Sequence, residues 1–239
     1  MTPPADRHDV AEGFFRESDY WRAWSSVPDA TADMAYALRA LHPAHHSLLD
    51  VPCGRGRLLK AIAMCRPDLR LVGLDVNRDM VRQARDSVPR ALGLVASVYE
   101  LPFANRTFDL VACHQSFMHF ERPAVAIREL TRVARRDVYL SVTTRRQLNT
   151  LLRRVGLLGV SNVPHWTYNV EDLADLLPND EFVWTVTGAF LLGPKALRLS
   201  HTRYFRLHRI IGRRVPQWLA RRFGQTLFVY GHRRGVEGV

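Results

Sequence analysis

The chain is poor in cysteine, in lysine and in long apolar runs. Its three cysteines, Cys53, Cys65 and Cys113, are odd in number and far apart, so neither a disulfide framework nor a paired-cysteine metal site is expected. No apolar run reaches the roughly eighteen residues of a membrane span. The first residues lack the basic and apolar regions of a signal peptide. We therefore expect a reduced, cytoplasmic protein.

Acidic residues are absent from one long segment. Residues 182–236 contain eleven Arg or Lys and no Asp or Glu, in a chain whose net charge is +11. Only Lys60 and Lys195 are lysines, and arginine pairs with phosphate and carboxylate in bidentate fashion. Such a segment can bind nucleic acid, an anionic membrane surface or an anionic substrate. A general arginine bias of the source is the alternative.

Several signatures of well-defined chemistry are also missing. The chain has no G-x-G-x-x-G dinucleotide fingerprint, no Gly-Lys-Ser/Thr triphosphate cradle, no H-E-x-x-H and no G-x-S-x-G. Its ten histidines are scattered along the sequence. A metal site is therefore not expected, and neither is a serine hydrolase triad.

Residues 48–59 carry the strongest positive signal. They read Leu-Leu-Asp-Val-Pro-Cys-Gly-Arg-Gly-Arg-Leu-Leu, a buried strand ending at Asp50, a tight glycine turn and the start of a helix. A second acid, Asp75, ends the apolar run 71–74, about where nucleotide-binding βαβ units hold ribose hydroxyls. An acid at the first strand tip repels phosphate and suits a ligand with an ammonium group.

This stretch resembles the D-x-G-x-G-x-G signature of class I S-adenosylmethionine-dependent methyltransferases. The resemblance continues through residues 73–76 (Gly-Leu-Asp-Val), through 100–111 and to His119, and it covers about residues 31–189 plus a final strand. It implies S-adenosyl-L-methionine as the cofactor. The chain departs from the family pattern at Pro52, which offers no N–H, and at Ser97, where family members commonly carry Asp.

Strand-like and helical stretches alternate along most of the chain, which predicts an α/β fold with a mostly parallel sheet and helices on both faces. As in the resembled Rossmann-like family, we expect seven strands with the last one antiparallel. The expected strands are about residues 47–51, 69–75, 91–96, 107–113, 137–142, 181–187 and 225–230. The expected units are an N-terminal helical cap (1–45), a cofactor-binding core (46–190), a basic helical insertion or lid (191–224), and a final core strand and tail (225–239).

The resemblance also implies roles around the cofactor. Asp50 faces its ammonium end, Asp75 accepts both ribose hydroxyls and Val76 lies against the adenine. Tyr20 and Trp21 of the cap are candidates for closing the pocket, the alternative being packing on the sheet edge. The whole predicted cofactor set is Asp50, Pro52, Cys53, Gly54, Gly56, Asp75, Val76, Ser97, Val98, Tyr99, His114, Tyr20 and Trp21.

Methyl transfer is an in-line displacement, so the protein mainly aligns the acceptor and excludes water. A histidine can take the proton of a hydroxyl acceptor. His114 and His119, which follow the fourth strand, are the candidates, with packing as the alternative for His119. His165, Tyr168, His201 and Tyr204 are expected to reach the substrate from the cap side.

The favoured function is methyl transfer to a small, anionic or lipid-linked molecule in biosynthesis, with peripheral contact to an anionic membrane surface. RNA methylation is one alternative: the basic segment favours it, but the N/D-P-P-Y/F tetrad of amino-directed enzymes is missing, so a nucleic-acid partner is not expected. The other alternative is a protein that binds S-adenosylmethionine without catalysis. The departures from the family pattern at Pro52 and Ser97 support this alternative. The sequence gives no indication of the oligomeric state.

Overall fold

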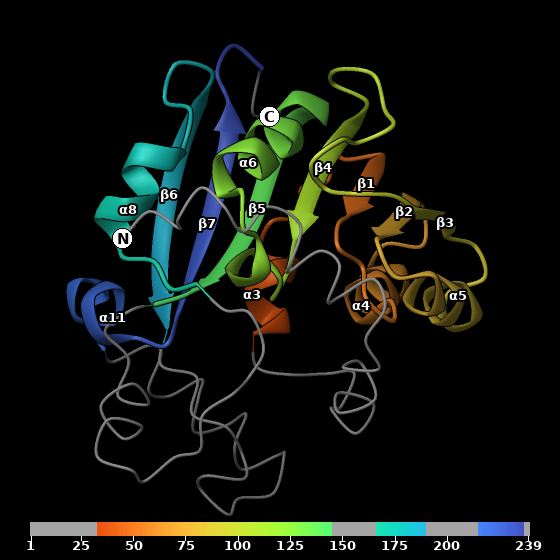
Figure 1. The fold of residues 1–239 in the computed structure, drawn as a ribbon, viewed down its shortest axis with the longest axis horizontal. Coiled ribbons are helices and arrows are strands. Elements are labelled where there is room, and N and C mark those ends of the chain that lie inside the picture. The colour runs from red at the N-terminus through yellow and green to blue at the C-terminus, as the bar shows by residue number, and fades with distance from the viewer. Residues whose placement is uncertain (1–32, 145–165, 190–214, 237–239) are drawn as a thin grey trace, which may run out of the picture.

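The computed structural model describes residues 33–144, 166–189 and 215–236 (Figure 1). Within these ranges seven strands form one sheet in the order β3-β2-β1-β4-β5-β7-β6. The predicted α/β fold class is confirmed. The strands are β1 (Ser47–Asp50), β2 (Arg70–Asp75), β3 (Leu92–Val95), β4 (Phe108–Cys113), β5 (Ala134–Thr143), β6 (Phe182–Ala189) and β7 (Thr226–Arg233).

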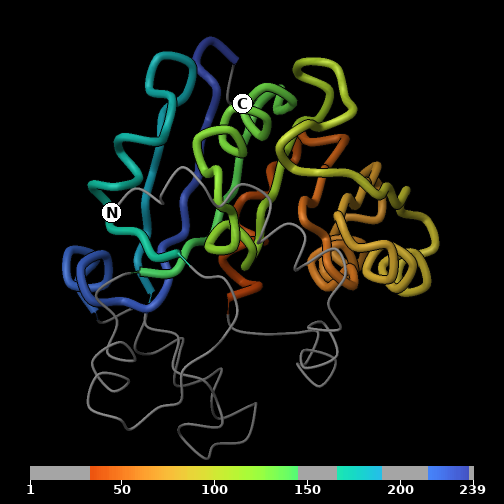
Figure 2. The backbone as a smooth tube through the Cα atoms, viewed as in Figure 1, coloured from red at the N-terminus to blue at the C-terminus, as the bar shows by residue number. Residues whose placement is uncertain are grey.

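The first five strands are parallel, and β7 runs antiparallel to both of its neighbours, β5 and β6. The last strand of the chain is therefore inserted between two earlier ones, as the trace in Figure 2 shows. Since β6 and β5 are both antiparallel to β7, β6 points the same way as the parallel strands. The carboxyl ends of β1 to β6 therefore lie at one edge of the sheet, which we call the carboxyl edge. The opposite edge is called the amino edge.

Helices cover both faces of the sheet because successive strand residues point to opposite sides. Leu48 of β1 packs with α3, α4 and α5, and Leu49 packs with α6 and α8. Figure 1 shows α6 and α8 in front of the sheet. The described helices are α3 (Met34–Leu38), α4 (Arg57–Cys65), α5 (Arg78–Ser87), the 3-10 turn η1 (Phe117–His119), α6 (Pro123–Val133), α8 (Val170–Leu176) and α11 (Gln217–Phe223).

Local sequence explains where several helices begin. The Asn77 side chain accepts from the N–H groups of Asp79 and Met80 and so caps α5. Asn169 and Asp172 form a capping box at α8, and Pro123 occupies the first turn of α6. No helix within the described ranges has both the length and the apolar composition to cross a bilayer.

The structure adds detail that the sequence pattern did not give. β5 begins at Ala134 rather than near residue 137, because Ala134 pairs with Phe108 across an irregularity in the β4–β5 register. Residues 1–32 of the predicted cap and residues 191–214 of the predicted insertion lie outside the described residues.

Candidate active site

The turn after β1 forms the centre of the carboxyl edge. The Val51–Pro52 peptide bond is cis. The Cys53 N–H donates to the Leu74 carbonyl at 2.8 Å, so the turn is bonded to the end of β2. Gly56 is the N-cap residue of α4; its φ of 80° favours glycine, and a Cβ there would lie 2.9 Å from the Ala84 Cα.

Asp75 ends β2 and turns its carboxylate toward this turn. Oδ2 accepts from the Gly54 N–H at 2.9 Å, and Oδ1 accepts from the Asn77 N–H at 2.9 Å. The residue is 6% exposed. Burial raises the pKa of Asp75 to about 6, although the backbone N–H groups of Asn77, Gly54 and Val76 act to lower it. A carboxylate has about four acceptor positions, so two bonds leave capacity for a ligand.

Asp50 ends β1, the neighbouring strand. It is 1% exposed, and its Oδ1 makes no hydrogen bond with the described residues. Burial, and then the charge of Asp75, raise the pKa of Asp50 well above its usual range. A buried acceptor without a donor is costly, which is why such atoms mark places where a ligand completes the bonding.

The space beside these two acids suits a nucleoside ligand with an ammonium group. Gly54 has φ 49°, and a Cβ placed there would meet no atom within 4 Å. A ligand can therefore approach the backbone at Gly54. The Asp50 Oδ1 can accept from an ammonium group, and Asp75 can accept from ribose hydroxyls. The residues present therefore fit S-adenosylmethionine.

The loop after β3 holds three further residues of the predicted cofactor set. The Ser97 hydroxyl accepts from the Tyr99 N–H at 3.1 Å and so shapes the loop itself. Val98 is buried in the core, and the Tyr99 hydroxyl accepts from the Glu121 N–H at 3.0 Å. Val76, at the end of β2, is half-buried. Tyr99 therefore connects this loop to the segment before α6.

Two buried thiols lie near the acids. Cys53 is 6% exposed, and its side chain occupies the space over Gly73, 3.1 Å from where a Cβ would be. Burial raises the pKa of both Cys53 and Cys113 well above the usual range, and the nearby carboxylates add to this. Both thiols are therefore held in the neutral form and serve as packing groups.

His114, directly after β4, is held by partners that the sequence did not reveal. Its Nδ1 lies 3.1 Å from the Tyr139 hydroxyl, and the two rings stack. Its Nε2 lies 3.0 Å from Asp33 Oδ2, within ion-pair distance but not aligned for a hydrogen bond. The next residue, Gln115, has φ 55°, and its N–H donates to the Ser141 hydroxyl at 2.6 Å. Only tertiary pairing with β5 and with the start of α3 brings these groups together.

Of the remaining predicted site residues, the structure describes His119 and Tyr168. His119 ends η1 and is half-buried, while Tyr168 is 6% exposed and its ring centroid lies 5.3 Å from that of Phe117. Burial raises the pKa of the Tyr168 hydroxyl. Tyr20, Trp21, His165, His201 and Tyr204 lie outside the described residues.

In the part of the chain that the structure describes, no group of three or more His, Cys, Asp or Glu could hold a metal ion. A cleft of about 570 Å³ opens at the amino edge between α6, α8 and the start of β6. Two of the four arginines that line it, Arg132 and Arg233, pair with Glu129 and Glu181.

Comparison with known proteins bears on this geometry. Residues 49–142 match a family model described as a methyltransferase domain. An uncharacterized methyltransferase of Schizosaccharomyces pombe is 26% identical over 154 residues, covering 59% of this chain and 53% of that protein. A malonyl-[acyl-carrier protein] O-methyltransferase of Legionella pneumophila is 29% identical over 141 residues, covering 57% and 50%. The chain thus matches about half the length of these curated relatives.

Solved structures extend the likeness to nearly the whole chain. The plantazolicin methyltransferase BpumL, in complex with SAH, aligns with a TM-score of 0.64 at 15% identity, covering 93% of each chain. At this identity the alignment shows a shared fold.

Proposed function

We propose that this chain, whose residues 49–142 match a methyltransferase-domain family model, is a class I methyltransferase that binds S-adenosyl-L-methionine and transfers its methyl group to a small molecule. One observation carries the proposal. Two buried carboxylates, Asp50 and Asp75, end adjacent strands, and neither pairs with a basic side chain in the described part of the chain. Buried carboxyl groups whose pKa is raised in this way cluster at functional sites.

The chain's own residues supply binding and alignment. Asp75 holds the ribose hydroxyls, Asp50 Oδ1 accepts from the ammonium end, and Gly54 lets the ligand lie against the backbone. When bound, the cofactor supplies an electrophilic methyl group on a sulfonium.

His114 is our candidate for handling the acceptor's proton. If Nδ1 donates to the Tyr139 hydroxyl at 3.1 Å, then Nε2, which makes no hydrogen bond, is left as the basic atom. A proton taken at Nε2 would be stabilised by Asp33 Oδ2, 3.0 Å away. This arrangement suits an acceptor that carries a hydroxyl group. His119 is the second candidate for the same role.

The acceptor class is proposed to be anionic or lipid-linked. The support is the basic segment 182–236 and the methyltransferases of small molecules and carrier-bound acids among the relatives. Peripheral contact with an anionic membrane surface belongs to the same proposal. We also retain the division into a cap (1–45), core (46–190), basic lid (191–224) and final strand and tail (225–239).

Calorimetry with S-adenosylmethionine and with SAH tests the cofactor assignment. We expect micromolar dissociation constants for both and a crystal soak that places the ribose at Asp75. Tritiated methyl donor, supplied together with an RNA fraction and with a small-molecule extract, tests the acceptor class. Label in the small-molecule fraction supports the proposal, whereas label in RNA, or binding without any transfer, contradicts it.

A further inference from the structure

The helix α11 (Gln217–Phe223) has an unusual surface. Trp218 is 67% exposed and Phe223 is 42% exposed. Arg221 and Arg222, which lie between them, are exposed as well. Large aromatic side chains are normally buried, so two of them open to solvent on one short helix indicate a contact surface.

The helix is fixed rigidly to the sheet, so its exposed residues have a defined direction. A Cβ at Gly188 of β6 would lie 2.2 Å from the Ala220 backbone carbon, which shows how closely the helix approaches the strand. The Gly188 N–H also donates to the Gln217 Oε1 at 3.2 Å. Of the helix residues, only Ala220 is buried and Leu219 is half-buried. Trp218, Arg221, Arg222 and Phe223 are exposed to solvent.

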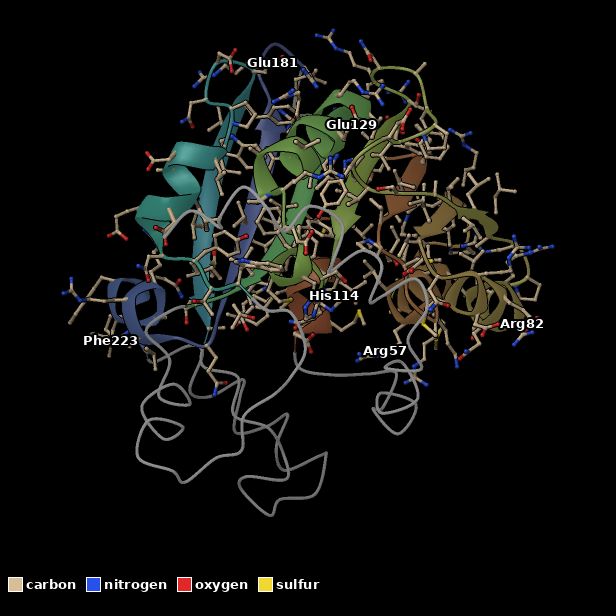
Figure 3. All side chains as sticks on the ribbon, in the orientation of Figure 1. Arg57, Arg82, His114, Glu129, Glu181 and Phe223 are labelled. Atoms are coloured by element: carbon tan, nitrogen blue, oxygen red, sulfur yellow. The ribbon has the colours of Figure 1, made fainter. Side chains whose placement is uncertain are left out.

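The surface lies at the carboxyl edge. It directly precedes β7, whose first residue, Thr226, pairs with Ala189 at the carboxyl end of β6. In Figure 3 the labelled Phe223 and His114 both lie toward this end of the sheet. A molecule that docks on α11 therefore faces the same side as the candidate active site.

We propose that Trp218, Arg221, Arg222 and Phe223 of α11 form a docking surface for an anionic lipid bilayer. The aromatic rings enter the interface between headgroups and acyl chains, where Trp is favoured, and the guanidinium groups bind the phosphates. Charge complementarity supports this occupant, because residues 182–236 carry eleven basic residues and no acid. This inference extends the proposed membrane contact, but it does not require methyl transfer.

A bilayer fits the surface better than a nucleic acid does. Single-stranded nucleic acid is held in a basic groove that follows its backbone. The exposed aromatic and basic residues instead lie on one short helix, and the Arg222 guanidinium lies 5.7 Å from the Phe223 ring centroid. An exposed helix surface of aromatic and basic side chains is suited to enter a bilayer surface.

Sedimentation with phosphatidylglycerol vesicles and with phosphatidylcholine vesicles tests the proposal on the full chain. We expect binding to the first and little binding to the second, with loss at high salt. Trp218→Ala should weaken vesicle binding roughly tenfold, because much of a large ring leaves the apolar phase. Arg221→Ala and Arg222→Ala should each weaken it about fivefold.

Matched controls lie on the far helices. Arg82→Ala removes an exposed arginine of α5, and Met64→Ser removes a 79% exposed apolar side chain of α4. Both should leave vesicle binding within twofold of wild type. Equal losses in the controls, equal binding to both vesicle types, or binding to RNA alone would overturn the docking surface. Asp75→Ala should keep vesicle binding while losing the cofactor, so failure of the two proposals can be told apart.

Discussion

At the amino edge of the sheet the carboxylates of Asp109 and Asp137 are surrounded by donors, whereas at the carboxyl edge those of Asp50 and Asp75 face no basic side chain in the described residues. Figure 3 marks the two ends, with Glu129 and Glu181 toward one and His114 toward the other. The same sheet therefore holds buried and half-buried acids in two opposite electrostatic conditions.

Asp109 illustrates the amino edge. It is 1% exposed, and it accepts from the His46 N–H at 2.9 Å, from the Ser47 hydroxyl at 3.0 Å and from Arg135 Nε at 2.7 Å. Burial acts to raise its pKa, but these donors outweigh burial and lower the pKa below the usual value. The acid therefore stabilises the fold in its ionised form.

Asp137 follows the same rule. His45 Nε2 lies 2.6 Å from one of its oxygens, and His232 Nδ1 lies 2.7 Å from the other. Burial acts to raise the pKa of Asp137, and the two imidazoles more than offset it. At the carboxyl edge no basic side chain offsets burial, so the pKa values of Asp50 and Asp75 rise. The difference supports the proposed ligand site at the carboxyl edge, while the acids at the amino edge are bonded within the fold.

The largest expected effect is on the amino edge. Asp109→Ala should lower the free energy of unfolding by about 3 kcal/mol, because several buried donors lose their acceptor. Urea unfolding followed by circular dichroism measures this. At temperatures where the variant is folded, its dissociation constant for SAH should match that of wild type. A large loss of affinity without loss of stability would mean that the two edges are not separate.

Asp75→Ala tests the carboxyl edge. Removing the acceptor of both ribose hydroxyls should weaken SAH binding about 100-fold, since bonds to a charged group are strong. Calorimetry measures the change. Asp79→Ala is the matched control, because Asp79 is a solvent-exposed acid just beyond β2 and should leave affinity unchanged. Near-normal affinity in Asp75→Ala would remove the ribose assignment.

The pH dependence of cofactor binding is the smallest of the three effects. Asp75 has a pKa of about 6 in the free protein, so it gains a proton as pH falls through 6 and loses acceptor capacity. Affinity for SAH should then fall up to about tenfold per pH unit below 6. Asp75→Ala should flatten this profile. A wild-type profile that is flat from pH 7 to 5 would contradict the role of the ionised carboxylate.

Folding stability should respond to Asp75 in the opposite direction. Folding raises the pKa of Asp75 from 3.8 to about 6. Protonated Asp75 therefore stabilises the folded state fully at pH values below 3.8, and this contribution is lost as pH rises through 6. Weaker cofactor binding at pH 5 is therefore not expected to arise from unfolding at this residue. Comparing the melting temperature and the affinity over the same pH range separates the two effects.

Much of the carboxyl edge could be predicted from sequence, because its signals are local. A strand followed by an acid and a glycine turn fixes where Asp50 and Gly54 lie, and the next strand places Asp75 beside them through the parallel β1–β2 register. The partners of His114 could not be predicted in this way. Asp33 and Tyr139 lie far from it along the chain, and no periodicity connects them.

Ser97 shows the limit of reading a single position. Family members commonly carry Asp at this position, whereas in this fold the Ser97 hydroxyl accepts from the Tyr99 N–H and shapes the loop. Pro52 is the other departure from the family pattern, and it has no N–H. The N–H of Cys53 makes the hydrogen bond that connects this turn to β2.

The sequence by itself determined the strand and helix pattern, the glycine turn and the two acids, because each depends on residues within a few positions of one another. Only the tertiary structure decided which buried acids have partners, which side chains hold His114 and that the aromatic rings of α11 face solvent. Those properties depend on the packing of segments distant in the chain, and the free energy of a buried charge depends on what surrounds it.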